Sequence, residues 1–164
     1  MCICGKKCSS FAFASCVPSP YCVGWVSFGR NMEVDMPIRV LVCGGRDFKD
    51  QDKLFRVLDK IDNEEPYITA IINGMAKGAD KMSSYWAQAC SDSIAIEEYP
   101  AQWRVYGKSA GYKRNTQMLV EGKPDLVVAF PGGKGTAMMI KIARDAGVEV
   151  LEVTDELNFA KYWR

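Results

Sequence analysis

Three short apolar segments of this sequence each run into a glycine-rich turn. The segments and the turns that follow them are residues 38–43 with 44–47, residues 67–72 with 73–80, and residues 126–130 with 131–136. After each turn, apolar residues recur at the three- and four-residue spacing of a helix. A chain that alternates apolar strand, tight turn and helix in this way is typical of a parallel sheet covered by helices.

The same pattern extends over most of the chain. We expect strands at residues 38–43, 67–72, 94–99, 126–130 and 148–153, and helices at residues 53–61, 79–90, 111–120 and 136–146. Because the strands lack strict polar alternation, both faces of the sheet should be covered. The predicted fold class is therefore α/β, a doubly wound parallel sheet of about five strands with helices on both faces. Residues 100–108 are expected to form a loop, and residues 155–163 are a candidate for a short terminal helix.

The composition excludes several classes of function. The 164 residues are 48% hydrophobic and 25% charged, as in a soluble globular domain. The chain contains no histidine, which excludes Ser-His and Cys-His catalysis and histidine-bound zinc. The net charge of +1 gives no general attraction for nucleic acid, and no segment reaches the roughly 18 apolar residues of a membrane span. We expect a cytoplasmic protein without metal or cofactor, and without membrane or nucleic acid as its main partner.

The first 35 residues differ from the rest of the chain. Five of the seven cysteines lie there, at positions 2, 4, 8, 16 and 22. Such crowding is compatible with a disulfide knot or a thiolate metal site, but the spacings fit neither a CxxC pair nor a zinc ribbon. We interpret residues 1–35 as an N-terminal appendage and residues 36–164 as the folded domain, with Met32 or Met36 as a candidate native start.

The turn at residues 131–136 indicates a ligand most directly. It reads Pro131-Gly132-Gly133-Lys134-Gly135-Thr136. The N–H groups of such a turn and the positive end of the helix that follows together favour an anion. The spacing is not that of a P-loop, since Gly135 separates Lys134 from Thr136. We predict that this turn binds a phosphate-bearing ligand.

The other two glycine turns should lie beside it, because the carboxyl ends of parallel strands meet at one edge of a sheet. Their candidate ligand-binding residues are Gly44, Gly45, Arg46 and Asp47 in the first turn, and Gly74, Lys77 and Gly78 in the second. Each of the three turns thus carries one basic residue, and basic residues suit a phosphate. The alternative is that the glycines only permit tight turns between strand and helix.

A basic and aromatic cluster occupies residues 103–118. Its candidate ligand-binding residues are Trp103, Lys108, Arg114 and Asn115. Arginine makes bidentate bonds to phosphate, and the ring of Trp103 or Tyr106 offers a flat surface on which a base can stack. The same mixture suits single-stranded nucleic acid, and it also occurs on ordinary solvated helices, so these alternatives stay open.

Acidic residues adjoin two of the turns. Asp47 and Asp80 are candidates for a catalytic base, with Arg114 as a third catalytic candidate. Asp80 equally suits the first turn of a helix, where a carboxylate is stabilised without any chemistry. Asp47 suits a bond to a ribose hydroxyl or an ion pair with Arg46. Cys43 ends an apolar strand and is predicted to be a core residue rather than a nucleophile.

Several segments in a fixed order carry a resemblance to a known family. They are VLVCGGRDF at residues 40–48, GMAKGAD at 74–80, Trp103 with GKSAG at 107–111, Arg114-Asn115, and FPGGKGT at 130–136. The chain resembles the YspA-type, YpsA-related branch of the SLOG superfamily, whose relatives include the LONELY GUY (lysine-decarboxylase-like) phosphoribohydrolases and DNA-processing protein A. The resemblance spans residues 37–153. It implies a Rossmann-like domain, a homodimer formed by helix packing, and a nucleotide-derived ligand such as an ADP-ribose derivative.

The resemblance also bears on activity. Phosphoribohydrolases carry the motif PGGxGTxxE, whose glutamate acts in cleavage of the base–ribose bond, and an arginine near the sugar that Arg114 resembles. In this chain the glutamate position is Met139, which can neither stabilise an oxocarbenium-like charge nor activate water. We therefore expect nucleotide binding for sensing or sequestration, in a phage–bacterium conflict. The alternatives are hydrolysis of an N-glycosidic or phosphate bond and, with less support, single-stranded DNA binding.

Overall fold

The structure is a computed structural model that describes residues 37–63, 67–90 and 93–153. The expected appendage at residues 1–35 and the expected terminal helix at residues 155–163 lie outside the described residues.

Five parallel strands form a single sheet in the order β3-β2-β1-β4-β5. Their bounds are β1 Ile38–Cys43, β2 Ile68–Asn73, β3 Ala95–Glu98, β4 Leu126–Ala129 and β5 Glu149–Glu152. All four neighbouring pairs are parallel. The doubly wound α/β prediction is confirmed, and each strand lies within one or two residues of its predicted range.

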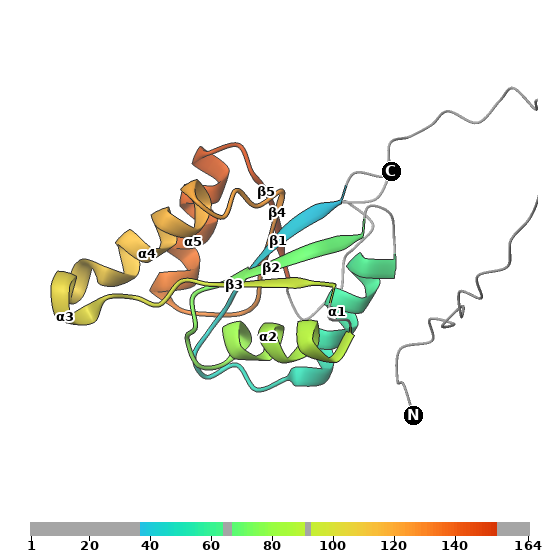
Figure 1. The fold of residues 1–164 in the computed structure, drawn as a ribbon. Helices are drawn as coiled ribbons and strands as arrows, with labels where there is room; N and C mark the ends of the chain where they lie inside the picture. Colours follow the sequence, from blue (N-terminus) through green and yellow to red (C-terminus); the bar gives the residue numbers. More distant parts are fainter. Residues whose placement is uncertain (1–36, 64–66, 91–92, 154–164) are drawn as a thin grey trace, which may run out of the picture. The chain divides into compact units, whose positions relative to one another are not determined.

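Helices cover both faces of the sheet (Figure 1). Helices α1 Gln51–Asn63 and α2 Ala79–Cys90 cover one face, and α4 Ala110–Val120 and α5 Lys134–Asp145 cover the other. The segment between β3 and α4 is not the expected loop. It contains the short helix α3 Trp103–Tyr106 and the 3-10 turn η1 Gly107–Ser109. Neither contains a buried residue, so they leave no apolar periodicity in the sequence.

The core consists of two apolar layers separated by the sheet. Val40 and Val42 of β1 pack with Leu58 and Trp86 on the face of α1 and α2. Leu41 and the other alternate residues of β1 point to the opposite face, where they meet α4 and α5. Burial on both faces explains why the strands read as continuous apolar runs, and it supplies most of the stability of the domain.

The neighbours β1 and β4 define where a ligand site can form. Cys43, at the end of β1, is in register with Ala129, at the end of β4. The chain leaves β1 toward β2 and leaves β4 toward β5, so the two connections run to opposite sides of the sheet. In open α/β sheets the crevice outside such a switch point is the usual place for a ligand. Among the described helices, none has the length and apolar character that a membrane crossing requires.

Candidate functional site

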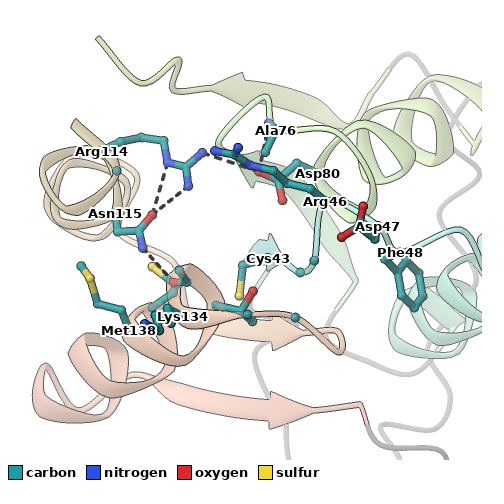
Figure 2. Close-up of a pocket in the computed structure, with 18 of the residues that line it drawn as sticks. Cys43, Arg46, Asp47, Phe48, Ala76, Asp80, Arg114, Asn115, Lys134 and Met138 are labelled. Carbon is teal, nitrogen blue, oxygen red and sulfur yellow. Dashed lines mark hydrogen bonds and ion pairs between the residues drawn. The ribbon is translucent and has the colours of Figure 1, made fainter. Parts of the chain in front are cut away.

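A cavity of about 850 Å³ lies at the carboxyl ends of β1 and β4 (Figure 2). It brings together most of the predicted site residues. Those that line it are Gly44, Gly45, Arg46, Asp47, Asp80, Trp103, Lys108, Arg114, Asn115, Pro131, Gly132, Gly133, Lys134, Gly135 and Thr136. The structure therefore assembles the first and third glycine turns with the basic and aromatic cluster.

Three predicted residues of the second turn do not line the cavity. Lys77 is exposed and is not among the residues that line the cavity. Gly78 has a φ of +86°, and a Cβ there would lie 2.2 Å from the carbonyl oxygen of Gly45. Gly74 lies against the guanidinium of Arg114. Gly74 and Gly78 thus allow the second turn to pack closely against Arg114 and the first turn. Ala76 and Asp80 of the same region line the cavity.

The first and third turns are joined directly. The N–H of Gly45 donates a hydrogen bond of 3.0 Å to the carbonyl oxygen of Pro131. A Cβ on Gly132 would lie 2.7 Å from the nitrogen of Gly45 and 2.2 Å from Oγ1 of Thr136. Glycine is required at position 132 because the two backbones approach so closely.

The amino terminus of α5 faces this cavity. The helix begins at Lys134, two residues earlier than predicted, because Gly133 adopts the extended conformation of an N-cap. The first bond that closes a helical turn runs from the N–H of Ala137 to the carbonyl oxygen of Gly133. The N–H groups of Lys134, Gly135 and Thr136 therefore have no acceptor within the helix, as at any helix start. They are available to an anion, together with the positive end of the helix dipole.

Arg114 holds three segments together (Figure 2). Its Nη1 donates to the carbonyl oxygen of Gly74 at 2.9 Å, and its Nε and Nη2 donate to Oδ1 of Asn115 at 3.2 and 3.1 Å. Nδ2 of Asn115 donates in turn to the carbonyl oxygen of Gly135 at 3.2 Å. Arg114 and Asn115 thus connect the second turn, α4 and the start of α5, which makes Arg114 a positioning residue as well as a cation beside the cavity.

Asp80 lies in the first turn of α2, as one of its two predicted roles requires. Its Oδ2 accepts hydrogen bonds from the N–H groups of Gly74 and Ala76, each at 3.2 Å, and lies 3.9 Å from Nη1 of Arg114. Burial raises the pKa of the Asp80 carboxyl, while Arg114 and the two amides oppose the rise. These contacts hold the second turn in place.

Arg46 and Asp47 do not pair with each other, although an ion pair was one of the predicted roles of Asp47. The guanidinium carbon of Arg46 lies over the ring of Trp103, 5.9 Å from its centroid. Asp47 is exposed at the edge of the cavity.

Met139 and Cys43, two of the buried residues that line the cavity, are not suited to act as a nucleophile or base. Met139 is fully buried between the sheet and α5. Burial and the neighbouring Asp80 raise the pKa of the Cys43 thiol to about 12, and Arg114 only partly opposes them. Cys43 is a core residue, as predicted, and its thiol stays protonated at neutral pH.

Sequence reasoning missed part of the lining. Gly111 and Met118 belong to it, and with Asn115 they follow the i, i+4, i+7 spacing of one face of α4. That spacing was the signal that would have identified them. Phe48 also lines the cavity and packs on Phe130 with ring centroids 5.1 Å apart.

Comparisons with known proteins identify the family of this chain. A profile of the family described as YspA, cpYpsA-related SLOG matches residues 38–106, which run from β1 to the end of α3. The "Gene 61 protein" of Mycobacterium phage D29 is 32% identical over 123 residues, an alignment that covers 72% of this chain and 98% of that protein. With its five-stranded doubly wound sheet and its glycine turns at the β1–β4 switch point, the chain belongs to the YspA, cpYpsA-related SLOG family.

Proposed function

We propose that this protein binds a nucleotide or nucleotide-derived ligand in the cavity at the β1–β4 switch point, for sensing or sequestration. Membership of the SLOG family suggests nucleotide-related ligand binding or processing. The proposal places phosphate at the amino terminus of α5, where the N–H groups of Lys134 to Thr136 face the cavity.

Two glycines carry this proposal. Apart from the adjoining residues and the nearby backbone of the helix itself, a Cβ on Gly133 or Gly135 would meet no atom of the protein within 4 Å, and neither residue has a positive φ. Neither the backbone conformation nor the packing of the protein therefore calls for glycine at these positions. Gly135 even costs the helix about 1 kcal/mol relative to alanine. Close approach of a ligand to the backbone explains both residues, because a methyl group would occupy the ligand's place.

Charge and size support the same ligand class. Arg46, Lys108 and Lys134 line the cavity from three different segments, which suits a ligand with one or more phosphates. The volume of about 850 Å³ lies within the range of about 300–1,000 Å³ that is usual for small-molecule sites.

Calorimetric titration with AMP, ADP-ribose and cyclic ADP-ribose tests the proposal. We expect at least one of them to bind, and Gly135→Ala to abolish that binding while the free energy of unfolding stays equal or rises by up to about 1 kcal/mol. Lys134→Gln should weaken binding several-fold. Lys141→Gln, in the same helix but outside the cavity, is the matched control. Absence of heat with every nucleotide in a folded sample would refute the proposal.

Turnover of the ligand is the second candidate, and the observation that favours it is the buried Asp80 carboxyl beside the cavity, whose pKa is raised. A carboxyl of this kind can act as a general acid. Chromatography of nucleotides incubated with the protein distinguishes the two functions. Product formation that disappears in Asp80→Asn would show catalysis, whereas intact nucleotides across the panel would support binding alone.

A further inference from the structure

Arg46 and Trp103 both line the main cavity, are exposed to solvent and contact each other. Arg46 follows β1 and Trp103 begins α3, which follows β3, so the two residues come from the carboxyl ends of two different strands of the sheet. Both line the cavity, and the guanidinium carbon of Arg46 lies 5.9 Å from the centroid of the indole. We call these two residues the Arg46–Trp103 pair.

Both side chains of the Arg46–Trp103 pair are exposed to solvent. Among the described residues, no acidic side chain forms an ion pair with Arg46. Trp103 leaves 51% of its surface in water. Covering apolar surface stabilises a complex by about 25 cal/mol per Å². A flat apolar group that covered the indole face would therefore gain binding energy there.

The segment that carries Trp103 contributes no buried residue to the core, and it contacts α4 through the ammonium of Lys113 over the ring of Tyr106. Neither α3 nor η1 has a buried residue, and the N–H groups of Trp103, Val105 and Tyr106 bond only to Ala101 and Gln102. Gly107 links α3 to η1 with a φ of +48° and has open space around it. Movement of α3 away from Arg46 therefore breaks no contact with the apolar core.

We infer that the Arg46–Trp103 pair is the base-binding part of the site and that the ligand is a nucleoside phosphate with a planar aromatic base. This inference rests on the proposed function and specifies its ligand. The base stacks on the indole, and the guanidinium covers its other face. Two stacked layers at about 3.5 Å each need about 7 Å between guanidinium and indole. The present 5.9 Å thus has to widen by roughly 1 Å, which the attachment of α3 permits.

The other aromatic residues of the cluster are less suited to this role. Tyr106 lines a separate hollow of about 240 Å³, where the ammonium of Lys113 lies 3.8 Å from its ring centroid. Tyr112 lines the main cavity, but no cation lies over its ring among the contacts of the described residues. Trp103 alone combines a place in the main cavity with a guanidinium opposite its face.

The test compares AMP with ribose 5-phosphate, which carries the same phosphate on the same sugar without the base. Stacking of a base on an aromatic residue contributes roughly tenfold or more in affinity. We expect the wild type to bind AMP at least tenfold more tightly than ribose 5-phosphate. Trp103→Leu should remove most of that difference by weakening AMP alone, and Trp103→Phe should keep part of it. Arg46→Gln should also weaken AMP more than ribose 5-phosphate.

The controls separate the possible failures. Tyr106→Leu should change neither affinity, and Arg104→Gln, which alters an exposed cation of α3 outside the cavity, should do the same. Equal affinity of the wild type for both compounds would overturn the inference and leave the proposed function standing. Equal weakening of both compounds by Trp103→Leu in a folded sample would overturn it as well. Binding of neither compound to the folded wild type would overturn the base site, and the proposed function would fall with it only when ADP-ribose and cyclic ADP-ribose also gave no heat.

Discussion

The guanidinium of Arg114 lies directly against the backbone of Gly74, with Nη1 donating a 2.9 Å hydrogen bond to the Gly74 carbonyl oxygen. A Cβ at position 74 would come within 2.2 Å of that nitrogen. Because Gly74 has no side chain, the guanidinium of Arg114, which belongs to α4, can lie against the second turn.

Gly74→Ala should therefore displace Arg114. The methyl group would push the guanidinium away from Gly74 and leave the buried Asp80 without its neighbouring cation. We expect a loss of about 1–3 kcal/mol in the free energy of unfolding, measured in urea. Gly133→Ala, where the added Cβ meets open space, should leave stability within about 0.5 kcal/mol of wild type. Equal stability of the two variants would contradict the role of this contact.

Asn115→Asp tests the connection between α4 and α5. Asn115 is buried, and its Nδ2 donates to the carbonyl oxygen of Gly135. Aspartate would keep an acceptor for Arg114 but would place an oxygen against the Gly135 carbonyl, so we expect a loss of about 1–3 kcal/mol. Asn63→Asp removes the same kind of donor from an exposed bond and should cost less than about 0.5 kcal/mol. Thermal or urea unfolding of both variants gives the comparison, and similar losses would argue against a special role for Asn115.

The pKa of Asp80 predicts a pH dependence of stability. Burial raises this pKa above its ordinary value of 3.8, so the native state holds the proton more tightly than the unfolded chain does. The stabilisation from the neutral carboxyl is fully present below the unfolded pKa and is lost as the pH rises through the folded pKa. The difference in free energy of unfolding between wild type and Asp80→Asn should therefore fall as the pH rises from about 4. A difference that stays flat or grows between acid and neutral pH would show that the sign is wrong.

Cys43 should resist alkylation in the native protein. Its thiol is buried and has a pKa of about 12, so almost none of it is thiolate at pH of about 8. We expect iodoacetamide to modify Cys43 more than about tenfold faster in urea than in buffer. Mass spectrometry of the peptide that contains Cys43 measures both rates. Similar rates in the two conditions would mean that the thiol is accessible in the folded state.

The sheet could be predicted because its signals are local. The sequence displays the apolar runs that end at Cys43 and Asn73 and the glycines that follow them. Because strands alternate with helices, the sheet is parallel, and the turns after its strands lie at one edge of it. The start of α5 was misplaced by two residues because Gly135 does not resemble a helical residue. Helix α3 was missed altogether because none of its side chains is buried.

The roles of individual site residues depend on contacts that the sequence does not display. Arg114 is paired with Gly74 and Asn115, and this network makes it a positioning residue, while its predicted contact with a phosphate stays a prediction. Lys77 belongs to the same turn as Gly74 but does not line the cavity. The contact of Arg114 with Gly74 joins α4 to the second turn, so it depends on the tertiary fold and not on any local pattern.

The register of Cys43 with Ala129 means that two distant stretches of chain must meet before the cavity exists. A fragment that ended after α4 would keep the first two turns but would lack the third, and β1 would be left with an unpaired edge. Neither half alone would present both Gly45 and Pro131, whose hydrogen bond joins the turns. The ligand binding that we propose would therefore report complete assembly of the sheet, and a chain cut between α4 and β4 would regain it only when the two fragments associate.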